Sequence, residues 1–228
     1  MDALSVGSLS IDESVNEFEK TKRLAEIGIV DAQYNLGLCY MNGDGVAVDK
    51  SNAFKWYTLA AEAGDVKAQF KLGNIYLKGD AVTVDKYEAI KWYTKAAEAG
   101  FANAQFNLGN CYFNGDGVAV DKHEAVKWFS RAAEAGFTSA QYNLGVSYMT
   151  GEGVTVDKRE AVKWVSRAAE AGDETAQYYL GMCYENGDGV AVDENEAIKW
   201  FKLAAEAGNV DAQHIFFLKG KDFTAACA

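Results

Sequence analysis

The sequence predicts an all-α fold, an α-solenoid of 36-residue helix-turn-helix repeats, and two observations lead to it. One glycine returns six times at that spacing without an insertion, and the residues around it return with it. Self-similarity at a period of about 20 to 50 residues is the signature of a repeat architecture. Within each period, apolar residues recur three and four positions apart, which is the spacing of one helix face. The recurring glycines are Gly28, Gly64, Gly100, Gly136, Gly172 and Gly208.

Five complete repeats lie between two partial ones. Residues 1–13 are expected to form a loose tail, and residues 14–28 an N-terminal capping helix that corresponds to the second helix of a repeat. Lys20 and Thr21 stand there at positions that are otherwise aromatic or apolar, as suits a terminal helix facing water. Residues 209–228 are expected to form a C-terminal capping helix and tail. The complete repeats are 29–64, 65–100, 101–136, 137–172 and 173–208.

The first helix of each repeat is predicted to run from about Ala104 to Phe113 in the third copy. Ala104, Leu108 and Tyr112 lie four residues apart and therefore share the face that packs into the core. A glycine recurs inside this helix, although it costs about 1 kcal/mol relative to alanine. We expect it to allow the close approach of a neighbouring helix backbone. The glycines at this position are Gly37, Gly73, Gly109, Gly145 and Gly181.

A turn and a short extended linker, NGDGVAVD in the third repeat, join the two helices. Glycines in the turn permit the left-handed conformation that ends a helix, so Ala81, which replaces one of them, is strained if its φ is positive. An aspartate follows at the N-cap of the second helix, and a glutamate three residues later predicts a capping box in four repeats. The aspartates are Asp49, Asp85, Asp121, Asp157 and Asp193, and the glutamates are Glu88, Glu124, Glu160 and Glu196.

The second helix carries an apolar stripe, formed in the third repeat by Ala125, Trp128, Phe129, Ala132 and Ala133. All five tryptophans of the chain occupy one position of this helix. We expect them to be wedges in the core rather than ligand-binding residues. They are Trp56, Trp92, Trp128, Trp164 and Trp200.

Three of the four cysteines, Cys39, Cys111 and Cys183, occupy one position in alternate repeats. Packed helices lie about 8 to 10 Å apart, which places these cysteines roughly 20 Å from one another. A disulfide needs Cα atoms within about 7 Å, so we expect free thiols and a reducing compartment. The sequence contains no recognisable secretory signal and no apolar run of about 18 residues. These features predict a cytoplasmic location.

Composition and motifs disfavour several classes of function. A net charge of −11 argues against binding to nucleic acid, and also against binding to a membrane surface through a polybasic segment. The NGDGVAVDK segments lack the alternating oxygen ligands of a calcium loop. His123 and His214 are isolated, so neither a zinc site nor a catalytic triad is predicted, and no phosphate-binding loop follows a strand. We therefore expect no enzyme, no cofactor and no metal.

The segments AQYNLGLCY, GDGVAVDK, AFKWY and AAEAG resemble the Sel-one-like repeat family, a branch of the tetratricopeptide-type helical solenoids. The resemblance covers all five repeats and both partial ones. It implies right-handed superhelical stacking and a role as an adaptor or scaffold for other proteins. A secreted branch of the family pairs cysteines between the two helices of each repeat, and this chain lacks those pairs.

A partner-binding face is predicted on the side of each first helix opposite the packed one. A helix exposed on that side should be polar, but aromatic, methionine, aliphatic and asparagine side chains recur there in register. By the resemblance to tetratricopeptide solenoids, this face lines the concave groove, where rings anchor a peptide and amides bond its backbone. The alternative is that the aromatic residues only pack within their own repeat. We call this set the first-helix row, and it comprises Tyr34, Leu38, Met41, Phe70, Asn74, Leu77, Phe106, Asn110, Phe113, Tyr142, Val146, Met149, Tyr178 and Met182.

The predicted function is a non-enzymatic scaffold that binds a protein or peptide segment in that groove. One alternative is a structural protomer that assembles head to tail through its terminal half-repeats, and a more remote one is a hydrolase with an unrecognised site. Head-to-tail contacts give open filaments unless the rotation closes. Phe217 in place of the packing glycine, and the polar Lys20 and Thr21, favour a monomer or weak dimer.

Overall fold

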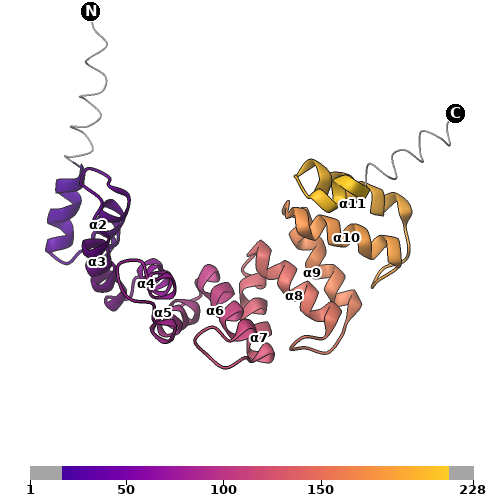
Figure 1. The fold of residues 1–228 in the computed structure, drawn as a ribbon, viewed down its shortest axis with the longest axis horizontal. Helices are drawn as coiled ribbons and strands as arrows, with labels where there is room; N and C mark the ends of the chain where they lie inside the picture. Colours follow the sequence, from indigo (N-terminus) through magenta and orange to yellow (C-terminus); the bar gives the residue numbers. More distant parts are fainter. Residues whose placement is uncertain (1–16, 216–228) are drawn as a thin grey trace, which may run out of the picture. The chain divides into compact units, whose positions relative to one another are not determined.

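The computed structural model describes residues 17–215, and their regular structure is helical throughout. Ten helices of 13 residues form five helix-turn-helix pairs, one in each predicted repeat (Figure 1). Residues 17–26 and 210–215 are also helical, where the capping helices were expected, whereas residues 1–13 and Phe217 lie outside the described part. The pairs are α2 (Val30–Asn42) with α3 (Lys50–Glu62), α4 (Val66–Lys78) with α5 (Lys86–Glu98), α6 (Ala102–Asn114) with α7 (Lys122–Glu134), α8 (Thr138–Thr150) with α9 (Lys158–Glu170), and α10 (Glu174–Asn186) with α11 (Glu194–Glu206).

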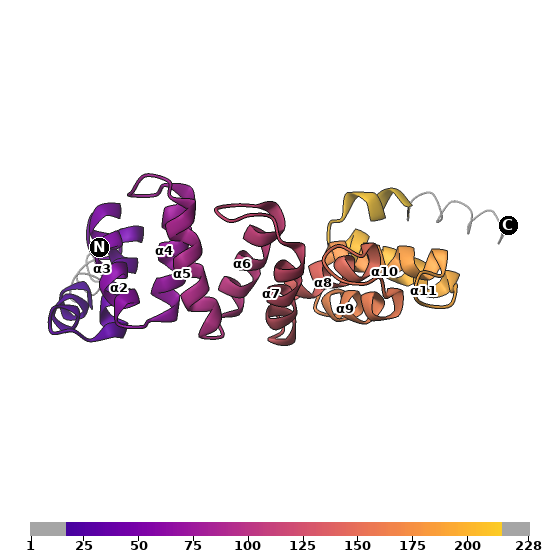
Figure 2. The same ribbon diagram turned by 90° about the horizontal axis from the view of Figure 1, so that it is seen from below.

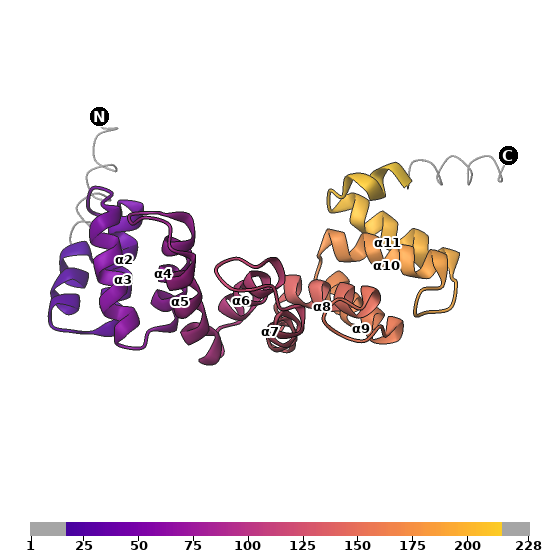
Figure 3. The same cartoon turned by 60° about the horizontal axis from the view of Figure 1, so that its bottom comes forward.

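The chain forms two compact units whose boundary falls inside α6. The described N-terminal unit comprises residues 17–108 and 116–119, and the C-terminal unit comprises residues 109–115 and 120–215. In the N-terminal unit, α2 packs on α3, α3 on α4, and α4 on α5 (Figure 2). In the C-terminal unit, the helices from α7 to α11 likewise pack each on the next (Figure 3). Contacts between sequence neighbours define a repeat architecture, and the predicted all-α solenoid is confirmed.

The glycine inside each first helix faces a buried side chain of the second helix that is larger than alanine. A Cβ added to Gly73 would lie 2.5 Å from the ring of Tyr93, and one on Gly109 would lie 2.6 Å from the ring of Phe129. The expectation of a neighbouring helix backbone is therefore wrong for the nearest contact, which is a side chain. Backbone carbonyl oxygens come within 3.3 Å of such a Cβ in the third, fourth and fifth repeats as a second contact.

The buried wedge of each second helix is the residue after the tryptophan. These residues are at most 2% exposed, whereas among the tryptophans only Trp128 is buried and the other four are half-buried. The prediction that all five tryptophans are core wedges therefore holds only in part: Trp56, Trp92 and Trp200 pack against the core clusters but remain partly exposed. The next residue points at the glycine, which leaves room for a ring, and the tryptophan lies to the side, where the Nζ of Lys95 stands 4.1 Å from the ring centroid of Trp92. The wedges are Tyr57, Tyr93, Phe129, Val165 and Phe201.

The five N-cap aspartates are confirmed, but the capping box is only half formed. The Asp85 carboxylate accepts a 3.0 Å hydrogen bond from the backbone N–H of Glu88. The Glu88 side chain does not return the bond, because the N–H of Asp85 already donates to the carbonyl of Tyr76 in the first helix, at 2.9 Å. Glu88 instead accepts from Lys91, and the other three glutamates pair with lysines in the same way.

The structure also bears on two smaller expectations, the strain at Ala81 and the state of the cysteines. Ala81 has a φ of 80°, a left-handed conformation that the equivalent Gly117 adopts without strain. The three cysteines in the repeats are thiols and form no disulfide within residues 17–215. Burial raises the pKa of the Cys183 thiol to about 11, so this thiol stays protonated at neutral pH.

Two side-chain contacts that the sequence analysis did not anticipate join successive repeats. The buried Gln69 donates from its amide nitrogen to the carbonyl of Ala61 at 3.1 Å, at the end of the preceding second helix. Lys50 pairs with Asp80, at 3.0 Å, in the turn of the next repeat. Two features of the sequence could have predicted these contacts: a glutamine that recurs once in every repeat, and a lysine that stands 30 residues before an acidic residue in the next turn. The glutamine bond recurs at Gln105, Gln141 and Gln177, and the ion pair recurs as Lys86–Asp116, Lys122–Glu152 and Lys158–Asp188.

Candidate partner-binding faces

All fourteen residues of the first-helix row are partly exposed, and none is fully buried or fully exposed. Their side chains therefore lie at the surface while one side of each packs on the protein. The two compact units share them equally. The N-terminal unit carries Tyr34, Leu38, Met41, Phe70, Asn74, Leu77 and Phe106, and the C-terminal unit carries Asn110, Phe113, Tyr142, Val146, Met149, Tyr178 and Met182.

In the N-terminal unit, row residues pack on the buried wedges of their own repeats. The ring centroid of Tyr34 lies 5.8 Å from that of Tyr57, and the centroid of Phe70 lies 5.9 Å from that of Tyr93. Asn74 accepts a 2.7 Å hydrogen bond from the Tyr93 hydroxyl through its side-chain oxygen. Packing within the repeat, the alternative considered from the sequence, therefore accounts for one side of these residues.

In the C-terminal unit, row residues also pack on neighbouring rings, beside a cavity of about 320 Å³. The ring of Phe113 lies 6.3 Å from the ring of the buried wedge Phe129, and Tyr142 packs edge-on against Tyr179 at 6.0 Å. Burial, with a smaller contribution from Asp173, raises the pKa of the Tyr142 hydroxyl. The cavity is lined by Asn110, Phe113, Asn114, Phe129, Tyr142, Asn143, Val146, Ser147 and Glu152.

Four of the cavity residues belong to the first-helix row. Of the other five, Asn114, Asn143 and Ser147 lie on the same first helices, and Phe129 and Glu152 lie outside them. Phe129 was predicted to lie in the core, and Glu152 lies in the turn after α8, so a helix-face argument could not place either at this surface. Asn143 could have been predicted from the sequence, because it directly follows the row residue Tyr142 and carries an amide.

The cavity presents little net charge. Its single carboxylate, Glu152, lies 2.5 Å from the Nζ of Lys122, which also stands 4.9 Å from the ring centroid of Phe113. The side-chain amides of Asn110 and Asn143 make no hydrogen bond with other residues in the described part of the chain. The lining therefore combines apolar rings with amide donors and acceptors that are available to a ligand.

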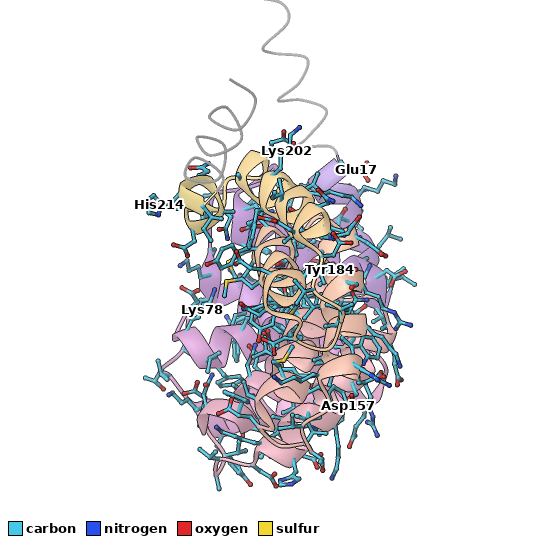
Figure 4. The ribbon with its side chains drawn as sticks, turned by 90° about the vertical axis from the view of Figure 1, so that its right-hand side faces the viewer. Glu17, Lys78, Asp157, Tyr184, Lys202 and His214 are labelled. Carbon is cyan, nitrogen blue, oxygen red and sulfur yellow. The ribbon has the colours of Figure 1, made fainter. Side chains whose placement is uncertain are left out.

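Neither histidine lines this cavity. His123 is exposed on α7, and His214, which Figure 4 labels, is exposed in the helical residues 210–215. Within residues 17–215, no group of three histidine, cysteine, aspartate or glutamate side chains is arranged to hold a metal ion. No helix in that range is long and apolar enough to cross a membrane.

The stacked helix pairs place this chain in the class of α-helical repeat proteins. More narrowly, the chain belongs to the Sel1 repeat family, whose repeat matches residues 30–65, 66–101, 102–137, 138–173 and 175–209. Sel1 repeat proteins are generally scaffolds for interactions between proteins, and the fold is generally non-enzymatic.

Solved structures agree with this assignment. The c5321 protective antigen of uropathogenic Escherichia coli, which displays an SLR fold, is 37% identical with a TM-score of 0.86, over 89% of this chain and 43% of that one. This chain thus spans less than half of that antigen's length. A Sel1 repeat protein from Oxalobacter formigenes is 34% identical with a TM-score of 0.83, over 92% of this chain and 88% of that one. The immunity protein Pa5087 from Pseudomonas aeruginosa, at 20% identity, a TM-score of 0.52, and 85% and 74% coverage, shares the fold alone. No curated protein matches the chain significantly.

Proposed function

We propose that this protein is a non-enzymatic scaffold that holds a peptide segment of a partner protein on the first-helix row. The observation that carries the proposal is the partial exposure of all fourteen row residues, which include aromatic, methionine and amide side chains. Helix faces that meet only water are polar, and aromatic residues and methionine are enriched where proteins meet.

Packing on one side of the row supports this role. The rings of Tyr34 and Tyr178 each lean on a buried wedge, at 5.8 Å between centroids in both cases. A ring held in place by the core loses little conformational entropy when a partner covers its other side. Such rings suit an anchor for a peptide, and amides between them suit bonds to its backbone.

The test is peptide binding by the full chain. Peptides from a random display library, selected on the protein and then synthesised, should bind the wild type and lose roughly tenfold or more in affinity with the double variant Phe106→Ser/Tyr142→Ser. Circular dichroism checks that the double variant keeps its helicity, and Asn110→Ala, which removes a half-exposed amide, provides a milder second variant. The control is Val120→Ser, which alters a side chain that is 59% exposed outside the row.

Unchanged binding by folded variants would contradict the proposal. So would a loss of binding in Val120→Ser equal to that in the row variants. If the double variant unfolds, the row is a packing element, and the Asn110→Ala result then decides whether it also binds peptides.

For the assembly state we propose a monomer or weak dimer rather than a head-to-tail polymer. A head-to-tail contact would have to complete a repeat from the two terminal half-repeats. Lys20 and Thr21 are polar where the complete repeats have aromatic or apolar residues, and Phe217 stands in place of the packing glycine, so the two half-repeats are poorly suited to each other. Light scattering should give a mass no larger than that of a dimer with increasing concentration, whereas mass that grows into long assemblies would favour the polymer.

A further inference from the structure

We infer that the cavity in the C-terminal unit is an anchor pocket for one large, uncharged apolar side chain of a bound peptide, with Asn110 and Asn143 bonding the peptide backbone beside it. The inference rests on the proposed function and assigns it a position and a ligand chemistry. It begins from a difference between repeats that share one backbone.

The wedge residue and the row residue that faces it differ from repeat to repeat. In the second repeat the Tyr93 hydroxyl donates to Asn74, so that the amide oxygen is used inside the protein. In the third repeat the wedge is Phe129, which has no hydroxyl, and the equivalent Asn110 keeps its amide for a ligand. In the first repeat the hydroxyl is present and the amide is missing: Leu38 stands at the asparagine position, and the buried Tyr57 hydroxyl has no hydrogen-bond partner.

Small side chains on α8 contribute to the space. Val146 stands where the fifth repeat has Met182, and Ser147 stands where the second repeat has Ile75. Ser147 turns its hydroxyl back to the carbonyl of Asn143, at 2.9 Å, and so presents little polarity to the cavity. The resulting volume of about 320 Å³ is at the lower end of the range for small-molecule sites and accepts one side chain such as an indole or an isobutyl group.

The walls favour an apolar guest. Phe113 and Tyr142 provide aromatic rings, which pack well against another ring or an aliphatic side chain. The two asparagine amides face the same space without internal partners and can bond the N–H and C=O groups of an extended peptide.

The charges exclude an ionic guest. Glu152 is already paired with Lys122, which is itself held over the Phe113 ring, so the lining offers no unpaired counter-ion. A lysine or glutamate side chain entering the cavity would lose hydration without a partner. The peptide anchor is therefore uncharged.

The experiment uses three minimal probes that combine a side chain with two peptide groups: N-acetyl-tryptophanamide, N-acetyl-leucinamide and N-acetyl-lysinamide. Each is titrated into the full-length ¹⁵N-labelled protein, and the side-chain amide resonances of the asparagines are followed. The tryptophan and leucine probes should shift Asn110 and Asn143, and the lysine probe should not.

Two variants close the pocket with residues that the chain itself uses at equivalent positions. Val146→Met introduces the larger side chain that the fifth repeat has at this position, as Met182, and Phe129→Tyr supplies a hydroxyl at the position from which Tyr93 bonds the row amide. Each should weaken the tryptophan probe roughly tenfold. The matched control, Leu38→Met, makes the same kind of change at the row position of the N-terminal unit and should leave the probe affinity unchanged.

The inference is overturned by equal binding of the lysine and tryptophan probes, by shifts only outside the cavity, or by full affinity in folded Val146→Met. The display-selected peptides separate this result from the proposed function. If Phe106→Ser/Tyr142→Ser abolishes their binding while Val146→Met and Phe129→Tyr do not, the scaffold role stands and the anchor pocket is wrong. If no variant of the row affects them, the proposed function fails as well.

Discussion

The second and third repeats show how one backbone can serve two purposes. Both place an aromatic wedge against a glycine of the first helix, at 2.5 to 2.6 Å from an added Cβ, and both carry an asparagine in the row. In the second repeat, Tyr93 and Asn74 bond each other. In the third, Phe129 leaves Asn110 beside a cavity. A single hydroxyl thus distinguishes a row amide that is bonded inside the protein from one that lines a cavity.

The largest effect should come from deleting either wedge. Tyr93→Ala and Phe129→Ala should each cost about 3 to 5 kcal/mol of unfolding free energy, because both rings are at most 2% exposed and fill the space over a glycine. Chemical denaturation monitored by circular dichroism gives the values. Trp92→Ala, which removes a half-buried ring, should cost clearly less than Phe129→Ala, and the reverse order would show that the tryptophan is the wedge.

A smaller and asymmetric effect should follow from replacing the row asparagines with leucine. Asn74→Leu removes the acceptor of the Tyr93 hydroxyl and should destabilise by about 1 to 3 kcal/mol. Asn110→Leu breaks no internal hydrogen bond and should change stability by less than about 0.5 kcal/mol. Urea unfolding gives the free energy of unfolding of each variant. Equal losses in Asn74→Leu and Asn110→Leu would show that the Asn110 amide contributes to the fold as much as the bonded Asn74 amide does.

The caps should behave alike in both repeats. Asp85→Ala and Asp121→Ala should each cost about 1 kcal/mol, because each carboxylate accepts a backbone N–H at the start of its helix. Glu88→Ala and Glu124→Ala should cost only a few tenths of a kcal/mol, since these residues form exposed pairs with lysine rather than a return bond. A loss of about 1 kcal/mol in the glutamate variants would instead indicate that the glutamate side chains do bond the N-cap N–H, as in a capping box.

The smallest effect concerns the turns, where Ala81 corresponds to Gly117. Ala81→Gly should stabilise by about 0.5 to 1 kcal/mol, because relief of the positive φ of 80° outweighs the added entropy of the unfolded chain. Gly117→Ala should destabilise by more than that gain, since its Cβ would lie 2.5 Å from the Lys86 carbonyl oxygen. A lower melting temperature in Ala81→Gly would contradict the strain.

Much of this architecture was open to prediction because it repeats. The period gave the five helix pairs, and helix periodicity separated the packed face of Ala104 and Leu108, both fully buried, from the row. Helix bounds were less accurate: α6 begins at Ala102, two residues before the predicted start. The capping box failed because its pattern is local, whereas the N–H of Asp85 is taken by Tyr76, nine residues earlier.

The sequence by itself determined the repeat, the fold class, the N-cap aspartates and the positions of the row, because these depend on periodicity and on short-range backbone chemistry. Only the tertiary structure decided which ring fills the core, which amide is bonded and where space remains. Those outcomes depend on side chains brought together from different helices, such as Asn110 on α6, Phe129 on α7 and Val146 on α8. Packing in three dimensions selects among neighbours that a helix period treats as equivalent.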